Sequence, residues 1–195
     1  MDPLARFLAD RAQARTAEDP CANLCVAATV DADGEPQART LVLRELDTTS
    51  GTRLAIFCNE TSPKWREMSN SSRIALSVFL PSSNLQYRLQ CTTVPIPVET
   101  VHESWQLRPD APKRLDWFYT LTMPQSAPIE SRDLLLMKCA GLELPDPLIA
   151  PETARGLYVI PEVIEKLDLN QPDGIHDRRL YQRRGEGWIE KFLVP

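Results

Sequence analysis

Residues 24–46 read LCVAATVDADGEPQARTLVLREL, and this stretch decides the fold class. The apolar run 24–30 suits a β-strand and stops at DADG (31–34), where Asp and Gly favour a tight hairpin turn. The run 36–46 is then expected to return beside the first as one strand. The stretch therefore predicts an antiparallel hairpin.

The rest of the chain predicts further short strands and a few helices. Helical spacing of apolar residues, or a capping residue followed by proline, predicts helices at 3–16, 62–70, 98–107 and 111–121. Strands are expected at 53–59, 73–80, 85–94, 156–160, 175–184 and 188–194, with a further short strand near 163–169 as an open alternative. The proline-rich segment 122–154 shows little periodicity and is predicted to be an irregular connection.

The order of these elements favours a barrel. Strands joined by tight turns pair antiparallel, and helices do not alternate with them as in a doubly wound sheet. We expect residues 1–195 to form one mainly β domain, a small antiparallel barrel with flanking helices, with the N-terminal helix in 1–20.

Composition excludes several classes of protein. The net charge of −5 is unlike that of a protein that coats nucleic acid. The sequence shows neither a long apolar run nor a secretion signal, so we expect a cytoplasmic protein that does not enter a membrane. The seven glycines form neither G-x-G-x-x-G nor a Walker loop. The five cysteines lack C-x-x-C and the two histidines lie far apart, so no metal site is expected.

Basic residues occur where a purely structural pattern would not place them. Arg39 and Arg44 lie five residues apart on the expected strand 36–46, so a flat strand would point them to opposite faces. Either the strand bulges or the two arginines serve different sites or subunits, unless both are simply solvated.

Lys64 lies in the first turn of the helix that Ser62 would cap, where the helix dipole disfavours a cation. A bound anion such as a phosphate would explain this lysine, although an exposed lysine indifferent to the dipole would give the same sequence.

The segment 175–183 (IHDRRLYQR) is the most polar of the expected strands. Alternation would place His176 and Arg178 on one face, where they could hold an electron-rich heterocycle. An edge strand with alternating charges would show a similar pattern.

Taken together, ARTLVLR (38–44), the Ser-Pro-Lys helix start (62–64) and HDRRLYQR (176–183) resemble the pyridoxamine 5′-phosphate oxidase family. Members of this family are flavoproteins built on the FMN-binding split barrel. The resemblance covers roughly residues 4–121 and 155–195, and its C-terminal motif is the most specific part. It implies an antiparallel split barrel that binds FMN between the two subunits of a homodimer.

The resemblance implies an FMN site made from several of these segments. Arg39, Ser62 and Lys64 would bind the FMN phosphate, and the backbone of residues 40–43 would run along the flavin. The cofactor-binding residues implied in this way are Arg39, Thr40, Leu41, Val42, Leu43, Arg44, Ser62, Lys64, Arg88, Gln125, Ser126 and Arg178.

Several of these positions differ from the family pattern. Arg44 stands at a lysine position, Pro63 replaces an arginine, and Arg88 replaces a glutamine that contacts the flavin. Gln125 and Ser126 resemble a Gln-Ser pair that reaches FMN from the neighbouring subunit, although the spacing needs an insertion.

The resemblance also implies which residues take part in the reaction. Arg178 matches the arginine near the flavin ring and His176 matches a substrate contact, so both are expected to be catalytic. Arg44, Arg108 and His176 are expected to contact the substrate. The flavin would carry the hydride chemistry, so no Ser-His-Asp or Cys-His nucleophile is required.

The half of the site that would recognise pyridoxamine phosphate departs from the pattern. Gly174 stands where the family has a substrate arginine, and Ser104 and Pro112 stand where it has a Tyr and a Ser on the phosphate side. A tryptophan expected near 168–169, at the flavin edge, is missing. The resemblance is therefore closer to a divergent branch of the family.

The expected function is that of an FMN-dependent oxidoreductase with a small-molecule substrate, either pyridoxamine or pyridoxine 5′-phosphate or a different compound. Two alternatives remain open: a barrel that binds FMN without turnover, and a flavin-free barrel that acts in protein interactions. Nucleic acid and membranes are not expected as partners.

Overall fold

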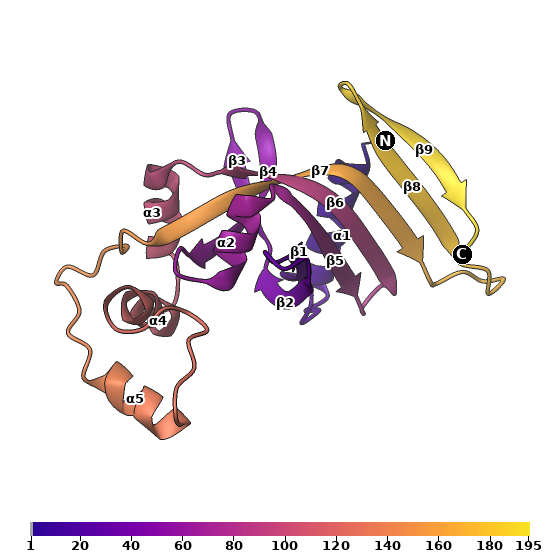
Figure 1. Cartoon of the computed structure of the whole chain (residues 1–195). Coiled ribbons are helices and arrows are strands. Elements are labelled where there is room, and N and C mark those ends of the chain that lie inside the picture. The colour runs from indigo at the N-terminus through magenta and orange to yellow at the C-terminus, as the bar shows by residue number, and fades with distance from the viewer. Residues whose placement is uncertain (1) are drawn as a thin grey trace. The chain divides into compact units, whose positions relative to one another are not determined.

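The computed structural model describes residues 2–195 (Figure 1). The chain divides into two compact units. The first contains the chain up to Ile56, Ser71–Val94 and Tyr158–Pro195. The second contains Phe57–Asn70 and Pro95–Leu157. The expectation that residues 1–195 make a single domain stays a prediction.

Within residues 2–195, nine strands form one sheet in the order β2-β1-β5-β6-β7-β4-β3, and β8 pairs with β7 and with β9. The strands are β1 (Leu24–Val30), β2 (Pro36–Val42), β3 (Arg44–Thr48), β4 (Gly51–Asn59), β5 (Arg73–Leu80), β6 (Leu85–Pro95), β7 (Ala154–Asp168), β8 (Asp177–Arg184) and β9 (Gly187–Leu193). The pairings of β1 with β2 and β5, β3 with β4, β5 with β6, and β8 with β7 and β9 are antiparallel. The predicted antiparallel architecture is confirmed.

The hairpin predicted from residues 24–46 is present. β1 and β2 pair along their whole length, from Leu24 opposite Val42 to Val30 opposite Pro36. In the turn, Asp31 Oδ1 accepts the backbone N–H groups of residues 33 and 35 at 3.0 and 2.9 Å. Gly34 has a φ of +86°, a conformation that glycine adopts at little cost.

The prediction of a single strand at 36–46 is wrong, because the chain leaves the ladder at Leu43. The Leu43 N–H donates to the Asn23 carbonyl at 2.9 Å, and the Leu43 carbonyl accepts from Arg11 Nη2 at 2.7 Å. This break lies between Arg39 and Arg44, so simple alternation along one strand does not relate the directions of the two arginines.

Five helices occur in the described chain: α1 (Pro3–Thr16), α2 (Pro63–Asn70), α3 (Val98–Gln106), α4 (Asp110–Leu121) and α5 (Arg132–Ala140). The helix α5 corrects the prediction that 122–154 is wholly irregular. Ser131 caps it by accepting the Leu134 N–H at 3.1 Å, and Gly141 follows its end. A second correction is that the segment 156–160 and the possible strand near 163–169 are parts of one continuous strand, β7, which ends at Asp168.

The first unit buries one face of its strands and exposes the other. Phe7 of α1 packs edge-to-face on Tyr87 of β6 with ring centroids 4.9 Å apart, and both residues are buried. The opposite face of β2, β1 and β5, which we call the open face, carries Val26, Val42 and Phe79, each at least 43% exposed. Figure 1 shows β8 and β9 as a hairpin at the C-terminal end of the chain.

No helix in residues 2–195 has both the length and the apolar character that crossing a membrane requires.

Candidate functional site

The start of α2 gathers two residues that the sequence placed in a phosphate site. Lys64 Nζ donates to Gln125 Oε1 at 3.1 Å, although the two residues are 61 positions apart. The backbone N–H of Gln125 donates to Thr61 Oγ1 at 3.1 Å. Ser62 is fully buried, and its Oγ accepts the Trp65 N–H at 3.3 Å, which supports the predicted N-cap. At the N-terminus of α2, the Lys64 ammonium and the Gln125 side-chain amide thus lie beside the N–H groups of the first helical turn.

The end of β4 fixes the loop that leads into α2. Asn59 is buried, and its Oδ1 accepts from the backbone N–H and the hydroxyl of Thr61 at 3.0 and 2.8 Å. Its Nδ2 donates to Thr153 Oγ1 at 2.9 Å. Burial raises the pKa of the neighbouring Cys58 to about 11, against an opposing effect of Lys64, so this thiol stays neutral at pH 7. The loop therefore positions Lys64 without a reactive thiolate beside it.

The strand β2 places Arg39 on the face opposite the open face. Arg39 is half-buried, and its Nη1 donates to the Thr29 hydroxyl and, at 3.4 Å, to the Ala27 carbonyl. Along the rest of the predicted flavin segment, Thr40 and Val42 are exposed, Leu41 is half-buried and Leu43 is buried. β2 stands at the end of the sheet order and is therefore an edge strand. A flat ligand could contact backbone groups along its outer edge.

One carboxylate brings Arg88 and Arg178 together. Arg178 Nε donates to Glu165 Oε1 at 3.0 Å, and Arg88 Nη1 lies 3.4 Å from both carboxylate oxygens. The Glu165 side chain is 12% exposed. Arg88 and Glu165 also line a cavity of about 270 Å³, together with Val163 of β7 and Val26 of the open face. Glu165 is not among the residues predicted from the sequence. The only signal for it was an acid on an expected strand among apolar residues, where a carboxylate needs a cation as its partner.

His176 and Arg44 lie at the starts of strands. β8 begins at Asp177, so His176 lies just before the strand and is exposed. The predicted strand 175–184 thus begins two residues later than expected, and alternation along β8 does not decide whether His176 and Arg178 lie on one face. Arg44 is half-buried and opens β3 opposite Ala55. Ser126, next to Gln125, is exposed and has a φ of 70°.

Arg108 pairs with a buried acid that the sequence did not single out. The Arg108 Nη1 donates to Asp116 Oδ2, and Trp105 Nε1 donates to the same oxygen at 2.8 Å. The Asp116 side chain is 5% exposed and that of Arg108 is 24% exposed. Burial raises the pKa of Asp116, while the charge of Arg108 and the indole hydrogen bond act against this rise. The only sequence signal was an acid between the apolar residues Leu115 and Trp117 of one helix.

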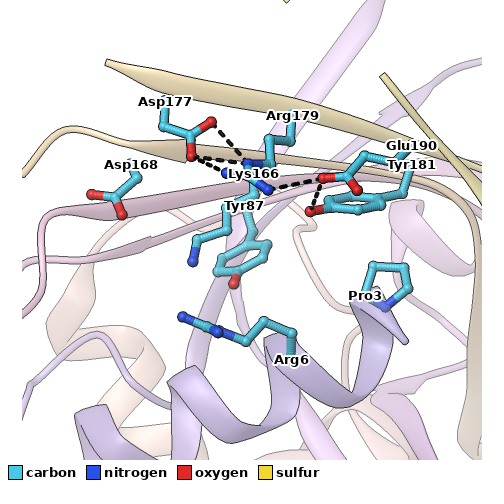
Figure 2. A pocket seen from close by; sticks show the side chains of 9 residues that line it. All are labelled: Pro3, Arg6, Tyr87, Lys166, Asp168, Asp177, Arg179, Tyr181 and Glu190. Carbon is cyan, nitrogen blue, oxygen red and sulfur yellow. Dashed lines mark hydrogen bonds and ion pairs between the residues drawn. The ribbon is translucent and has the colours of Figure 1, made fainter. Parts of the chain in front are cut away.

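A further pocket of about 390 Å³ lies in the first unit, between the start of α1 and strands β6 to β9 (Figure 2). Arg179 bonds to Asp177 and Glu190 there, and Tyr181 donates to Glu190 at 3.1 Å. Arg6 and Lys166, which also line the pocket, both pair with Asp10, at 3.1 and 3.3 Å. In residues 2–195 no group of three or more His, Cys, Asp or Glu side chains could hold a metal ion.

Comparison with known proteins gives the same family as the motifs. Residues 12–144 match the family model for pyridoxamine 5′-phosphate oxidase. The pyridoxine/pyridoxamine 5′-phosphate oxidase of Pseudomonas fluorescens is 31% identical over 199 residues, covering 100% of this chain and 89% of the relative. That of Anaeromyxobacter dehalogenans is 30% identical over 197 residues, covering 100% and 96%.

Two solved structures share the fold. PhzG from Burkholderia lata, in complex with tetrahydrophenazine-1-carboxylic acid, has a TM-score of 0.81 at 21% identity and covers 100% of this chain and 93% of its own. A pyridoxamine 5′-phosphate oxidase-related, FMN-binding protein from Nostoc punctiforme has a TM-score of 0.80 at 19% identity, covering 100% and 99%. These likenesses confirm the predicted fold class, an antiparallel split barrel with flanking helices. The chain belongs to the pyridoxamine 5′-phosphate oxidase family.

Proposed function

We propose that this protein is an FMN-dependent oxidoreductase with a small organic substrate. The relatives are named as oxidases, and one structural neighbour is named as FMN-binding. The observation that carries the proposal is the cluster of Lys64 and Gln125 at the capped start of α2. A cation, an amide and the positive end of a helix dipole suit a phosphate group.

The proposed roles are those that the family resemblance implies. Lys64 and the start of α2 bind the FMN phosphate, Arg39 is a second phosphate ligand, and the backbone of 40–43 lies along the ring. When bound, the flavin supplies the hydride chemistry. Arg178 provides positive charge near the ring, held in place by Glu165 at 3.0 Å. His176, which is exposed, exchanges a proton with an amine or alcohol substrate.

A second copy of the chain is the proposed partner of the open face. Val26, Val42 and Phe79 are each at least 43% exposed on this face. Exposed apolar side chains gathered on one face are typical of an interaction surface. The family resemblance places the flavin between two subunits, so the proposed homodimer would also complete the site.

The proposed substrate differs from pyridoxine 5′-phosphate. Gly174 supplies no cation, and Ser104 is only 7% exposed within α3, so it is poorly placed to meet a ligand. Pro112 has no N–H to donate. Each missing charged contact costs roughly 1.5–3 kcal/mol. We therefore expect oxidation of pyridoxine 5′-phosphate to be slow.

The test is anaerobic reduction of the FMN-loaded protein. Amine and alcohol substrates are added while the visible flavin band is followed, and air is then admitted while hydrogen peroxide is measured. Bleaching by at least one substrate, followed by recovery with peroxide, is the expected result. A flavin that binds but is never reduced would favour the FMN-binding alternative without turnover. Failure to bind FMN would overturn the proposal and favour the flavin-free interaction protein.

A further inference from the structure

We infer that Asp116 determines substrate specificity: its ion pair with Arg108 favours substrates that carry at most one negative charge and disfavours phosphate esters. This inference rests on the proposed function and on the substrate contact that the family resemblance implies for Arg108. It goes further because it names the charge class that the site accepts and the residue that sets it.

The geometry ties Arg108 firmly to Asp116. Both Arg108 Nη1 and Trp105 Nε1 donate to Asp116 Oδ2, the latter at 2.8 Å. The Arg108 backbone N–H donates to the Trp105 carbonyl at 3.0 Å, which holds the arginine at the end of α3. Trp105 is 1% exposed, so this donor cannot turn to solvent. The guanidinium therefore has a fixed partner.

The backbone of Asp116 is held within α4. The Asp116 main-chain carbonyl accepts from Asn59 Nδ2 at 3.3 Å and from Thr120 Oγ1 at 2.8 Å. Asp116 is 4% exposed as a residue, so movement towards solvent would require repacking of α4. A buried carboxylate is stable only with a charged or hydrogen-bonding partner. Arg108 is thus the counter-ion that Asp116 needs.

The charge of Asp116 also acts on Lys64, the proposed ligand of the FMN phosphate. The charges of Arg108 and Lys64 both act on this carboxylate. A phosphate dianion at Arg108 would meet a pair of zero net charge and would be repelled by the nearby carboxylate. It would also compete with Asp116 for Arg108 Nη1. A neutral or singly charged substrate avoids most of this penalty.

The experiment compares two ligands that differ only in their phosphate. Wild-type and Asp116→Asn proteins are first titrated with FMN, and the loaded proteins are then titrated with pyridoxine 5′-phosphate and with pyridoxine. Asn has nearly the size of Asp and still offers an oxygen to Trp105, but it carries no charge. We expect Asp116→Asn to bind pyridoxine 5′-phosphate about tenfold more tightly, the order of one charge-assisted contact, with pyridoxine unchanged.

Two further variants keep the test decisive. Asp110→Asn removes an exposed acid from the first turn of the same helix and should leave the ratio of the two affinities unchanged. If Asp116→Asn does not fold, the double variant Arg108→Gln/Asp116→Asn, which removes both charges of the pair and leaves no buried charge without a partner, replaces it. Because Asp116 already compensates Arg108, the loss of both charges should change pyridoxine 5′-phosphate binding by no more than about twofold.

Unchanged or weaker phosphate-ester binding in Asp116→Asn would overturn the inference, as would a tenfold or larger loss in the double variant. Unchanged binding would mean that the charge of Asp116 does not act on the substrate, and a loss in either variant would mean that the ion pair holds Arg108 for a phosphate. Normal FMN binding with such a result contradicts the inference alone, whereas absent FMN binding contradicts the proposed function.

Discussion

Lys64 occupies the first turn of α2, where the helix dipole alone would favour an acid. Its ammonium donates to Gln125 at 3.1 Å, so the side chain is held at the helix start. The sequence predicted the position of Lys64 because capping and the dipole are local. It could not predict that Gln125 lies beside Lys64 in the same chain, because that contact depends on how a segment 61 residues away folds back.

Replacing Lys64 with Ala should weaken FMN binding by about ten- to a hundredfold, since one charge-assisted phosphate contact is worth roughly 1.5–3 kcal/mol. The dissociation constant is measured by calorimetric titration of the flavin-free protein. Arg66→Ala, an exposed cation of the same helix, is the matched control and should bind FMN normally. Equal affinity in wild-type and Lys64→Ala would show that the start of α2 does not hold the phosphate.

Asp19 shows how a single carboxylate makes stability depend on pH. It is 8% exposed and accepts the backbone N–H groups of Ser82 and Cys21, each at 2.8 Å. Burial alone would raise its pKa, but these hydrogen bonds outweigh burial and lower it. The stabilisation is therefore present above the unfolded-state pKa of about 4 and is lost as the pH falls through the lower folded-state pKa.

Asp19→Asn should lower the free energy of unfolding at pH 7 by about 1–3 kcal/mol, because the amide offers one acceptor oxygen to two N–H groups. Urea unfolding at pH 7 and near pH 3 measures the change, and the gap between wild type and variant should narrow at the lower pH. A gap that stays constant between the two pH values would contradict the account.

At the level of elements, the hairpin of β1 and β2 was predictable because its turn chemistry lies within residues 31–34. The break after β2 was not, because there the Leu43 carbonyl bonds to Arg11, which lies 32 residues away on α1. The missed helix α5 did carry local signals, Ser131 before it and Gly141 after it. Its proline-rich surroundings obscured them.

The buried Arg11 should stabilise the segment that connects β2 to β3. It donates to Glu45, to the Ala22 carbonyl at 3.0 Å and to the Leu43 carbonyl at 2.7 Å. Arg11→Met should lower the free energy of unfolding by about 3–5 kcal/mol, because it leaves buried acceptors and a carboxylate without this partner.

Chemical denaturation measures the loss, and Arg15→Ala is its control. Arg15 contacts the same Glu45 at 3.0 Å but is 34% exposed, so its loss should cost less than about 1 kcal/mol. Similar losses in the two variants would mean that the buried contacts of Arg11 add nothing.

At the scale of the whole molecule, motifs predicted the fold class and candidate positions on several elements. The motifs did not predict Glu165 or Asp116, because the partner of each acid comes near only in the folded chain. Glu165 accepts from Arg178 at 3.0 Å, and Asp116 accepts from Trp105 at 2.8 Å. Sequence motifs thus predicted the cations of the candidate site but not the acids that hold them.

A stable dimer formed through the open face should bury well over about 2,000 Å² of surface, counted over both subunits. We expect sedimentation to show a dimer at micromolar concentration. Phe79→Asp should shift it to a monomer, because a charge would be buried at the interface. Leu121→Asp, an equally drastic change at a residue that is 58% exposed in α4, should leave the dimer intact. A wild-type monomer would contradict the proposed partner.

The central claim is that this chain binds FMN through its phosphate, and paired calorimetric titrations with FMN and riboflavin test it most directly. The two ligands share the flavin ring and differ in the phosphate. The account predicts tight, stoichiometric FMN binding and riboflavin binding weaker by about a hundredfold, the loss expected for the charge-assisted contacts of Lys64 and Arg39. Equal affinity for the two flavins, or no binding of FMN, would contradict it.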